Sequence, residues 1–215
     1  MKYGPIQHIK YLFNYNRTII HLQADLERVS LPKDISPLYV KELESNNLVD
    51  LENWLEVIND AYDEPIRDVN YALNHINNHL FLNISNVYLI FDANEAVGTI
   101  SIGTYKSNSK VGGDARIAIK KKYQGRGLGK FAISYGLAKL KERKVKYAES
   151  IITIIRVESI SLHFKCGFIP QYKRRFLQYT KQRRHFLIRL YCVLKVKKLY
   201  KDFLKKQSLL FLKPQ

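Results

Sequence analysis

One glycine-rich segment constrains the fold of this chain more than any other part. Residues 124–130 have the sequence QGRGLGK. Before this segment, residues 115–119 alternate in the way of a half-buried strand, and after it apolar residues recur at the spacing of an amphipathic helix. Glycines let the backbone turn sharply, and the first amides of a helix have no partner within it. The segment therefore predicts an anion site, favouring phosphate, at the helix N-terminus.

Two common phosphate loops are excluded by the spacing. The nucleotide P-loop requires a glycine five positions before its Gly-Lys pair and a Ser or Thr after it. This chain has Gln124 and Phe131 at those positions. The dinucleotide-binding turn requires a third glycine where this chain has Lys130.

A second segment lies about thirty residues downstream. The β-branched residues 151–155 are followed by residues 156–168, which predict a short helix, a glycine stop and another strand. Together the two segments resemble the GNAT superfamily of acyl-CoA-dependent N-acyltransferases. The pattern Gln124-x-x-Gly127-x-Gly129 is similar to the pyrophosphate-binding motif of that family. The pattern Ser159-x-x-Leu162-x-x-Lys165-x-Gly167-Phe168 is similar to its second motif.

The resemblance implies a mixed α/β (α+β) fold over roughly residues 36–193. Its central sheet is expected to be mostly antiparallel and flanked by helices, with the fourth and fifth strands parallel and splayed. Residues 87–91 and 97–102, around a polar turn, predict a hairpin that forms the second and third strands. Apolar residues at helical spacing predict two helices before it: Leu51, Trp54, Leu55, Ile58 and Tyr62, then Val69, Leu73, Ile76 and Leu80. We expect residues 1–35 to be an N-terminal extension and residues 194–215 a basic amphipathic tail.

Composition bounds the class of protein. With 215 residues and 46% hydrophobic residues, the chain is expected to be globular, as one domain with extensions. No apolar run approaches the roughly 20 residues that span a bilayer, and residues 1–5 lack the apolar core of a secretory signal. Cys166 and Cys192 show no metal or redox spacing, so we predict no metal and a reduced, cytoplasmic compartment.

Positive charge is concentrated at the end of the chain. Residues 171–215 contain 14 Lys and Arg against one acid, Asp202, and so hold +13 of the net charge of +17. Residues 186–191 predict a final strand, and a basic amphipathic helix is expected after residue 194. Four interpretations stay open for it: a solvated face, or contact with an anionic substrate, nucleic acid or an anionic membrane surface. Residues 1–35 are consistent with a hairpin, a helix, a substrate lid or the contact of a homodimer.

For function, the resemblance implies direct transfer of an acetyl group from acetyl-CoA to a primary amine in a ternary complex. Backbone amides at Ile117 and Ile119 are expected to face the thioester carbonyl and the pantetheine arm. Arg156 stands where the family frequently has asparagine, and an arginine there reaches a cofactor phosphate or a substrate carboxylate, or is simply exposed. The remaining predicted cofactor-binding residues are Gln124, Gly125, Arg126, Gly127, Leu128, Gly129, Lys130, Ser159 and Lys165.

Three residues are candidates for proton transfer. His163 stands where the family often has a tyrosine, and it is predicted either to protonate the departing CoA thiolate or only to pack the short helix. An alkyl ammonium has a pKa near 10.4, so a base must remove its proton. Asp114, at the start of the expected fourth strand, and Glu149, at the start of the expected fifth strand, are the candidate bases, with surface roles or a relayed water as alternatives.

Two other functions stay open. The chain is also consistent with a non-catalytic acyl-CoA-binding or nucleic-acid-binding module, and with an O-acyltransferase that acts on a sugar hydroxyl. The identity of the acceptor is not predicted by any motif.

Overall fold

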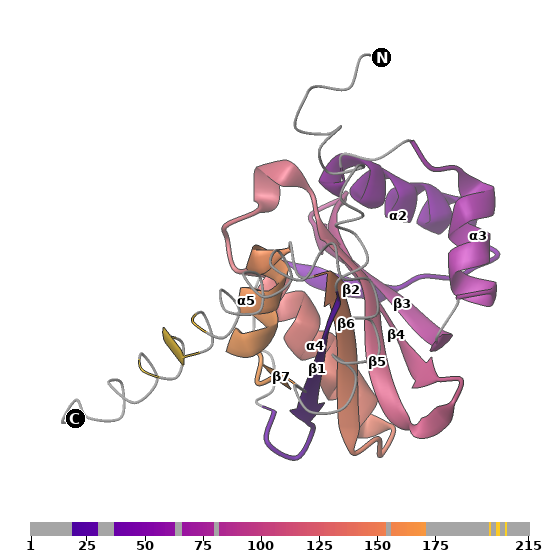
Figure 1. Ribbon diagram of the computed structural model, residues 1–215. Coiled ribbons are helices and arrows are strands. Elements are labelled where there is room, and N and C mark those ends of the chain that lie inside the picture. Colours follow the sequence, from indigo (N-terminus) through magenta and orange to yellow (C-terminus); the bar gives the residue numbers. More distant parts are fainter. Residues whose placement is uncertain are drawn as a thin grey trace, which may run out of the picture. The chain divides into compact units, whose positions relative to one another are not determined.

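The computed structural model describes residues 19–29, 37–62, 66–79, 82–153 and 156–170, and residues 198, 201, 202 and 205 (Figure 1). The chain forms two compact units, one of residues 24–150 and one of residues 1–23 with 151–215. Several sequence predictions lie outside the described residues: Leu80, Ile154, Ile155, residues 1–18, the strand at 186–191 and most of the basic tail.

The first unit is built on a mixed sheet. Four strands are antiparallel neighbours in the order β2 (Tyr39–Glu42), β3 (Leu82–Asp92), β4 (Glu95–Tyr105) and β5 (Asn108–Ile119). The next strand, β6 (Tyr147–Thr153), runs parallel to β5. The mostly antiparallel sheet with one parallel pair confirms the predicted fold class. The β3–β4 hairpin turns between Asp92 and Glu95, as predicted.

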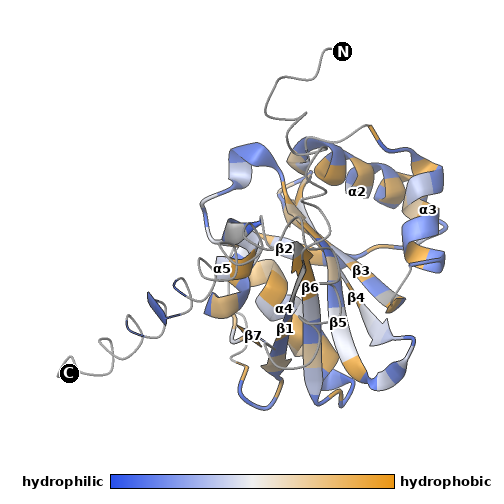
Figure 2. Cartoon of the chain, viewed as in Figure 1, coloured by the Kyte–Doolittle hydropathy of each residue, from blue (hydrophilic) through white to orange (hydrophobic). Residues whose placement is uncertain are grey.

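Helices α2 (Leu48–Ala61) and α3 (Val69–Asn77) cover one face of this sheet (Figure 1). Each begins at a residue whose side chain accepts backbone N–H bonds: Asn47 caps α2 and Asp68 caps α3. The hydrophobic side of α2, which Figure 2 shows in orange, packs through Trp54 on residues of β3 such as Leu89. Burial of each such large apolar side chain contributes about 1.5–3 kcal/mol.

Helix α4 (Leu128–Glu142) packs on the opposite face. The ring of Tyr135 on α4 lies edge-on to the ring of Tyr88 on β3, with ring centres 5.2 Å apart. A Cβ added at Gly136 would lie 2.7 Å from Ile100 of β4, so helix and sheet are in close contact there. Tyr88 and Leu89 are consecutive and therefore point to opposite faces of the sheet, which places α4 across the sheet from α2.

The second unit holds three described elements. Residues Leu22 and Gln23 of β1 (Ile19–Asp25) pair antiparallel with Pro170 and Ile169 of β7 (Ile169–Pro170). Strand and helix were both open for this N-terminal segment, and it forms a strand. The short helix predicted before the Gly-Phe pair is α5 (Val157–Lys165). No helix within the described ranges is long and apolar enough to cross a bilayer.

Candidate active site

The turn before α4 has the backbone that its glycines predict. A single 3-10 turn, η2 (Lys121–Tyr123), leads from β5 into the glycine-rich segment. Gly125 has φ +79° and Gly127, the N-cap of α4, has φ +86°. Glycine adopts this left-handed region without the strain that a Cβ brings. A Cβ added at either position would meet no protein atom within 4 Å. Within the protein, glycine is therefore favoured here by the backbone conformation and not by a lack of space.

The N-terminus of α4 is suited to an anion. Its first turn has no side-chain cap among the described residues, and the first bond within the helix runs from the Phe131 N–H to the Gly127 carbonyl (3.1 Å). The N–H groups of the first turn therefore point out of the helix end, where the helix dipole is positive. Residues 124–127 and Lys130 are exposed and can be reached by a ligand. This helix end therefore has the geometry that favours the binding of an anion.

Gln124 has a role that its motif position did not predict. Its side-chain Nε2 donates to the Ile119 carbonyl at 3.0 Å. This bond joins the glycine-rich turn to the last residue of β5. The turn and the strand that is predicted to bind the pantetheine arm are therefore held together by the chain itself.

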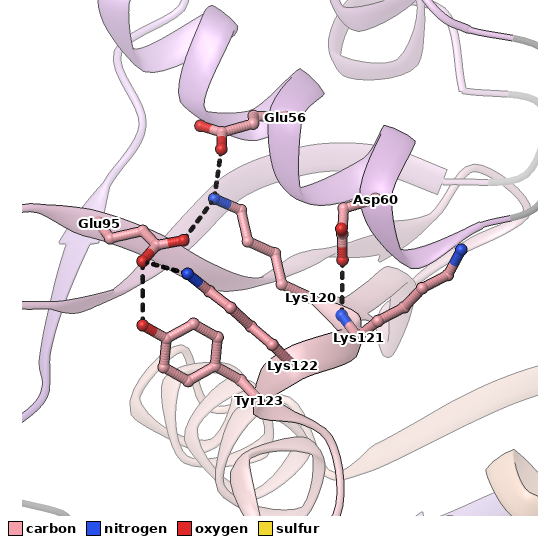
Figure 3. Close-up of polar contacts among 7 residues, drawn as sticks. All are labelled: Glu56, Asp60, Glu95, Lys120, Lys121, Lys122 and Tyr123. Carbon is pink, nitrogen blue, oxygen red and sulfur yellow. Dashed lines mark hydrogen bonds and ion pairs between the residues drawn. The ribbon is translucent and has the colours of Figure 1, made fainter.

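A lysine–carboxylate cluster lies next to the turn (Figure 3). Lys120, only 3% exposed, places its Nζ 2.6 Å from Glu56 of α2 and 3.1 Å from Glu95 of β4. Glu95 also accepts from Lys122 (2.9 Å) and from the Tyr123 hydroxyl (3.0 Å). In the same picture the Lys121 N–H donates to Asp60 of α2. The cluster therefore attaches η2 to both α2 and the β3–β4 hairpin.

Electrostatics keep this cluster charged. Hydrogen bonds from Lys122 and then Lys120 lower the pKa of Glu95 to about 2. Burial lowers the pKa of Lys120, but its hydrogen bonds to Glu56 and Glu95 outweigh burial and leave the pKa above its ordinary value. Sequence reasoning missed this cluster, because Glu56 and Glu95 are 64 and 25 residues from Lys120 and no local pattern connects them.

Strand β5 has a bulge where the oxyanion amides are predicted. Ala115 pairs with Ser101 and Ala118 with Thr99, so two residues of β5, Arg116 and Ile117, oppose one residue of β4. Arg116 has φ +47°, which is rare for a residue other than glycine. The hydroxyl of Tyr62, at the end of α2, donates to the Ile117 carbonyl at 2.8 Å. The bulge was not predicted by the alternating pattern of residues 115–119.

The parallel pair of strands is joined at one end only. Within the described residues, the β5–β6 ladder connects Val111 with Tyr147, Gly112 with Ala148 and Gly113 with Glu149. Strand β5 continues for six residues beyond Gly113 without a ladder partner on β6 in that part of the chain. This is the splay that the resemblance implies, and it leaves Ile117 and Ile119 on the stretch of β5 beyond the ladder.

Both candidate bases lie where that ladder ends. Asp114 follows Gly113 directly, and Glu149 is the ladder partner of Gly113, so the two lie on adjacent strands in neighbouring registers. Asp114 accepts a hydrogen bond from Ser150 Oγ at 3.2 Å. Strand β5 begins at Asn108, so Asp114 lies in its middle and not at its start as expected. The polar residues before it extend the strand because they pair with the end of β4.

Helix α5, in the second unit, carries the remaining predicted residues. His163 is 2% exposed, and its Nδ1 lies 2.7 Å from the Ser159 carbonyl. A carbonyl only accepts, so Nδ1 is the protonated donor in this contact. The His163 ring also lies edge-on to the Phe168 ring, with centres 5.0 Å apart. Arg156, the N-cap residue, and Lys165 are exposed.

The Gly-Phe pair of the second motif has a clear backbone function. Gly167 has φ +91°, its N–H donates to Phe164, and the Phe168 N–H donates to the His163 carbonyl, each at 3.1 Å. These two bonds form the Schellman motif that ends many helices. The motif closes α5 and buries the Phe168 side chain.

Comparison with known proteins agrees with this architecture. The model of the acetyltransferase (GNAT) family matches residues 50–168, which is more than half of the chain. A search of curated protein sequences finds no significant match.

Three solved structures illustrate the similarity of fold. A GCN5-related N-acetyltransferase from Sphaerobacter thermophilus has a TM-score of 0.56 and 14% identity, over 80% of this chain and 55% of that one. A GNAT-family protein from Novosphingobium aromaticivorans has a TM-score of 0.52 and 13% identity, and the match covers 72% of this chain and 61% of that one. The glucosamine N-acetyltransferase region of a fungal multi-domain β-N-acetylglucosaminidase has a TM-score of 0.52 and 13% identity. That match covers 79% of this chain and 22% of the fungal one.

At these identities the similarity is one of fold, and this chain spans less than two thirds of the length of each of the three. The family match itself includes both motifs, from the glycine-rich turn to Phe168. The protein therefore belongs to the GNAT acetyltransferase family.

Proposed function

We propose that this protein transfers an acetyl group from acetyl-CoA to a primary amine, by direct attack in a ternary complex. The observation that carries the proposal is the uncapped, exposed N-terminus of α4, entered through two glycines with positive φ and tied by Gln124 to β5. When bound, acetyl-CoA supplies a thioester as the acetyl donor.

The chain would hold acetyl-CoA along two segments. The amides of Gly125, Gly127, Leu128 and Gly129 would bind the pyrophosphate, with Arg126 and Lys130 adding positive charge. The N–H groups of Ile117 and Ile119 would face the pantetheine arm and the thioester carbonyl, where preorganised donors stabilise developing negative charge. On α5, we propose that Arg156, Ser159 and Lys165 add cofactor contacts.

Proton transfer would involve three side chains. Asp114 or Glu149 would accept the proton of the amine, directly or through a water. His163 would donate a proton to the CoA thiolate. Because Nδ1 of His163 donates to the Ser159 carbonyl, Nε2 is the atom that we assign to this proton.

Other parts of the proposal concern the whole protein. We propose a cytoplasmic location, from the cysteine usage, and an anionic partner for the basic residues 194–215. We also propose that residues 1–35 contribute to a homodimer.

The test mixes the full chain with acetyl-CoA and a panel of amines, and follows thiol release together with the mass of the products. Glucosamine belongs in the panel because it offers both an amine and hydroxyls, and a fungal GNAT region with the same fold acts on it. We expect amine-dependent thiol release and an amide product. An ester product would assign O-transfer, and CoA binding without release would assign a binding module.

A further inference from the structure

Two arginines converge on two tyrosines beside the β5 bulge. The Arg67 guanidinium, from the connection between α2 and α3, lies 5.5 Å from the centre of the Tyr62 ring and 5.0 Å from that of Tyr71. The Arg116 guanidinium, from the bulge, lies 5.9 and 5.4 Å from the same two rings. All four residues belong to the first unit. Both guanidinium groups therefore contact the same pair of rings, and we call these four residues the Arg–Tyr cluster.

The cluster concentrates positive charge. In the part of the chain that the structure describes, Arg116 forms no ion pair with a carboxylate. The Asp68 carboxylate caps α3 by accepting from the Tyr71 N–H at 2.9 Å. Burial first, and then the nearby Arg116 charge, lower the pKa of His79. Burial first, and then the nearby His79 and Arg116, lower the pKa of His75 to about 3. The surroundings of both histidines therefore disfavour the positively charged form of the imidazole.

The backbone presents Arg116 in an unusual way. Its φ of +47° is a conformation that a side chain makes unfavourable, and such outliers cluster at functional sites. The Tyr62 hydroxyl donates a hydrogen bond to the carbonyl of the adjacent Ile117 at 2.8 Å, and this bond connects the bulge to a tyrosine of the cluster. Arg116 is thus fixed next to Ile117, whose N–H is proposed for the thioester carbonyl.

A further donor points to the same kind of ligand. The Tyr71 hydroxyl is buried and has no hydrogen-bond partner among the described residues. Buried hydroxyls nearly always have a partner, so this one is available to an added acceptor atom. Two guanidinium groups and a hydroxyl are donors that match a carboxylate or a phosphate.

We propose that Arg116 and Arg67 bind an anionic group on the acceptor, so that the substrates are small amines that also carry a carboxylate or a phosphate. This inference rests on the proposed acetyl transfer. It specifies the acceptor class, which neither the family match nor the motifs do.

The test compares matched amines that differ in the anionic group. The pairs are β-alanine with β-alaninamide, and O-phosphoethanolamine with ethanolamine. We expect kcat/KM to be higher by about tenfold or more for the anionic member of at least one pair. The reason is that a hydrogen bond to a charged group contributes enough free energy to change an affinity by about that factor. The pair that shows the preference identifies carboxylate or phosphate as the group recognised.

Variants assign the preference to the cluster. Arg116→Gln is expected to bring the ratio within the preferred pair close to 1, mainly by raising KM for the anionic member, and Arg116→Lys to retain part of it. Lys106→Gln is the matched control, because Lys106 contributes to the same positive field at His79 but is not in the cluster. Arg116→Gly removes the guanidinium and relieves the φ strain, so it is expected to lose the preference with an unchanged or higher melting temperature.

Several outcomes would overturn the inference. One is a ratio near 1 in the unmodified protein for both pairs, and another is a preference that Arg116→Gln does not alter. If Arg116→Gln lowers the melting temperature and leaves the ratio unchanged, the arginine serves only the stability of the fold.

Calorimetry separates this inference from the proposed function. If no amine is acetylated, the acetyl-transfer proposal fails. Binding of β-alanine or O-phosphoethanolamine that is lost in Arg116→Gln would still support the anion site. No such binding in the unmodified protein would overturn it.

Discussion

Single residues with positive φ lie at one end of each of the two helices that carry the family motifs. Gly127 begins α4 and Gly167 ends α5, and each has the left-handed backbone that glycine adopts most easily. Two physical reasons favour glycine at position 127: the left-handed backbone itself, and room for the close approach of a ligand. Substitutions can separate the two.

The first prediction separates them at Gly127. Valine disfavours positive φ and adds bulk, whereas asparagine adds a side chain but tolerates this conformation. We expect Gly127→Val to weaken acetyl-CoA binding by about tenfold or more, measured by calorimetry. If approach of the ligand is decisive, Gly127→Asn weakens binding as much. If conformation is decisive, Gly127→Asn stays near the original affinity. Unchanged affinity in a folded Gly127→Val protein would contradict the placement of the pyrophosphate.

A second prediction concerns His163. His163→Ala is expected to lower kcat more than it changes the affinity for acetyl-CoA, because the ring is assigned to the thiolate proton. His163→Asn is the informative companion, since its amide can still donate to the Ser159 carbonyl but cannot act as an acid near neutral pH. Equal losses of kcat in both variants would support proton transfer. Normal turnover in His163→Asn would leave packing as the only role.

The third prediction concerns the base. At lower pH more of the amine is protonated, so a base matters most there. Asp114→Asn is expected to lower kcat/KM chiefly at lower pH, by up to about 10²-fold. Ser150→Ala, which removes the hydrogen bond to Asp114, controls for its positioning. A ratio of rates that does not vary with pH would move the base to Glu149 or to water.

At the scale of elements, the Lys120 cluster explains how the glycine-rich turn is held. It connects η2 to α2 through Glu56 and to the β3–β4 hairpin through Glu95. Removal of one partner from a buried charged group is commonly destabilising, because the remaining charge loses its compensation. The elements around the turn are therefore expected to depend on this cluster for their position.

The fourth prediction tests this cluster through pH. The pKa of Glu95 is lowered from 4.5 to about 2 in the folded protein, so its contribution to stability is fully present above pH 4.5 and is lost as the pH falls towards 2. The melting temperature of Glu95→Gln is expected to lie below that of the unmodified protein above pH 4.5, and the gap should narrow as pH falls towards 2. Glu142→Gln, which removes an exposed partner of Lys139, is expected to change little. A gap that stays constant across this range would contradict the role of Glu95.

At the scale of the molecule, charge is distributed unevenly. The first 170 residues carry +4 and the last 45 carry +13. Four tail residues that the structure describes, Lys198, Lys201, Asp202 and Lys205, are helical and exposed. Their spacing places them on one side of a helix. These four residues agree with the charged helical face that is expected in the tail.

The fifth prediction concerns this tail. Truncation after Val196 removes six lysines and is expected to leave folding and acetyl-CoA binding intact. Retention on a polyanion resin should fall, and retention of the full chain should decrease steeply with salt because displaced counterions drive such binding. A full-length variant with those lysines changed to Gln should behave like the truncation. Unfolding on truncation would instead show that Leu199, Phe203 and Leu204 belong to the core.

The sequence by itself determined the local features of this protein. The glycine-rich turn, the start of α4, the hairpin at Asp92–Glu95 and the Gly-Phe end of α5 each depend on residues a few positions apart. Such patterns are visible in a sequence because backbone preferences and side-chain periodicity act over short distances. The order of these elements was also sufficient to indicate the family.

Only the tertiary structure decided which distant residues meet. Lys120 meets Glu56 and Glu95, which are 64 and 25 positions away in the sequence. Arg116 lies over the rings of Tyr62 and Tyr71, which are 54 and 45 positions away. Charged residues at such separations show no periodicity, since their positions depend on how the sheet and helices pack. For the same reason, the candidate for acceptor recognition emerged from the fold and not from any motif.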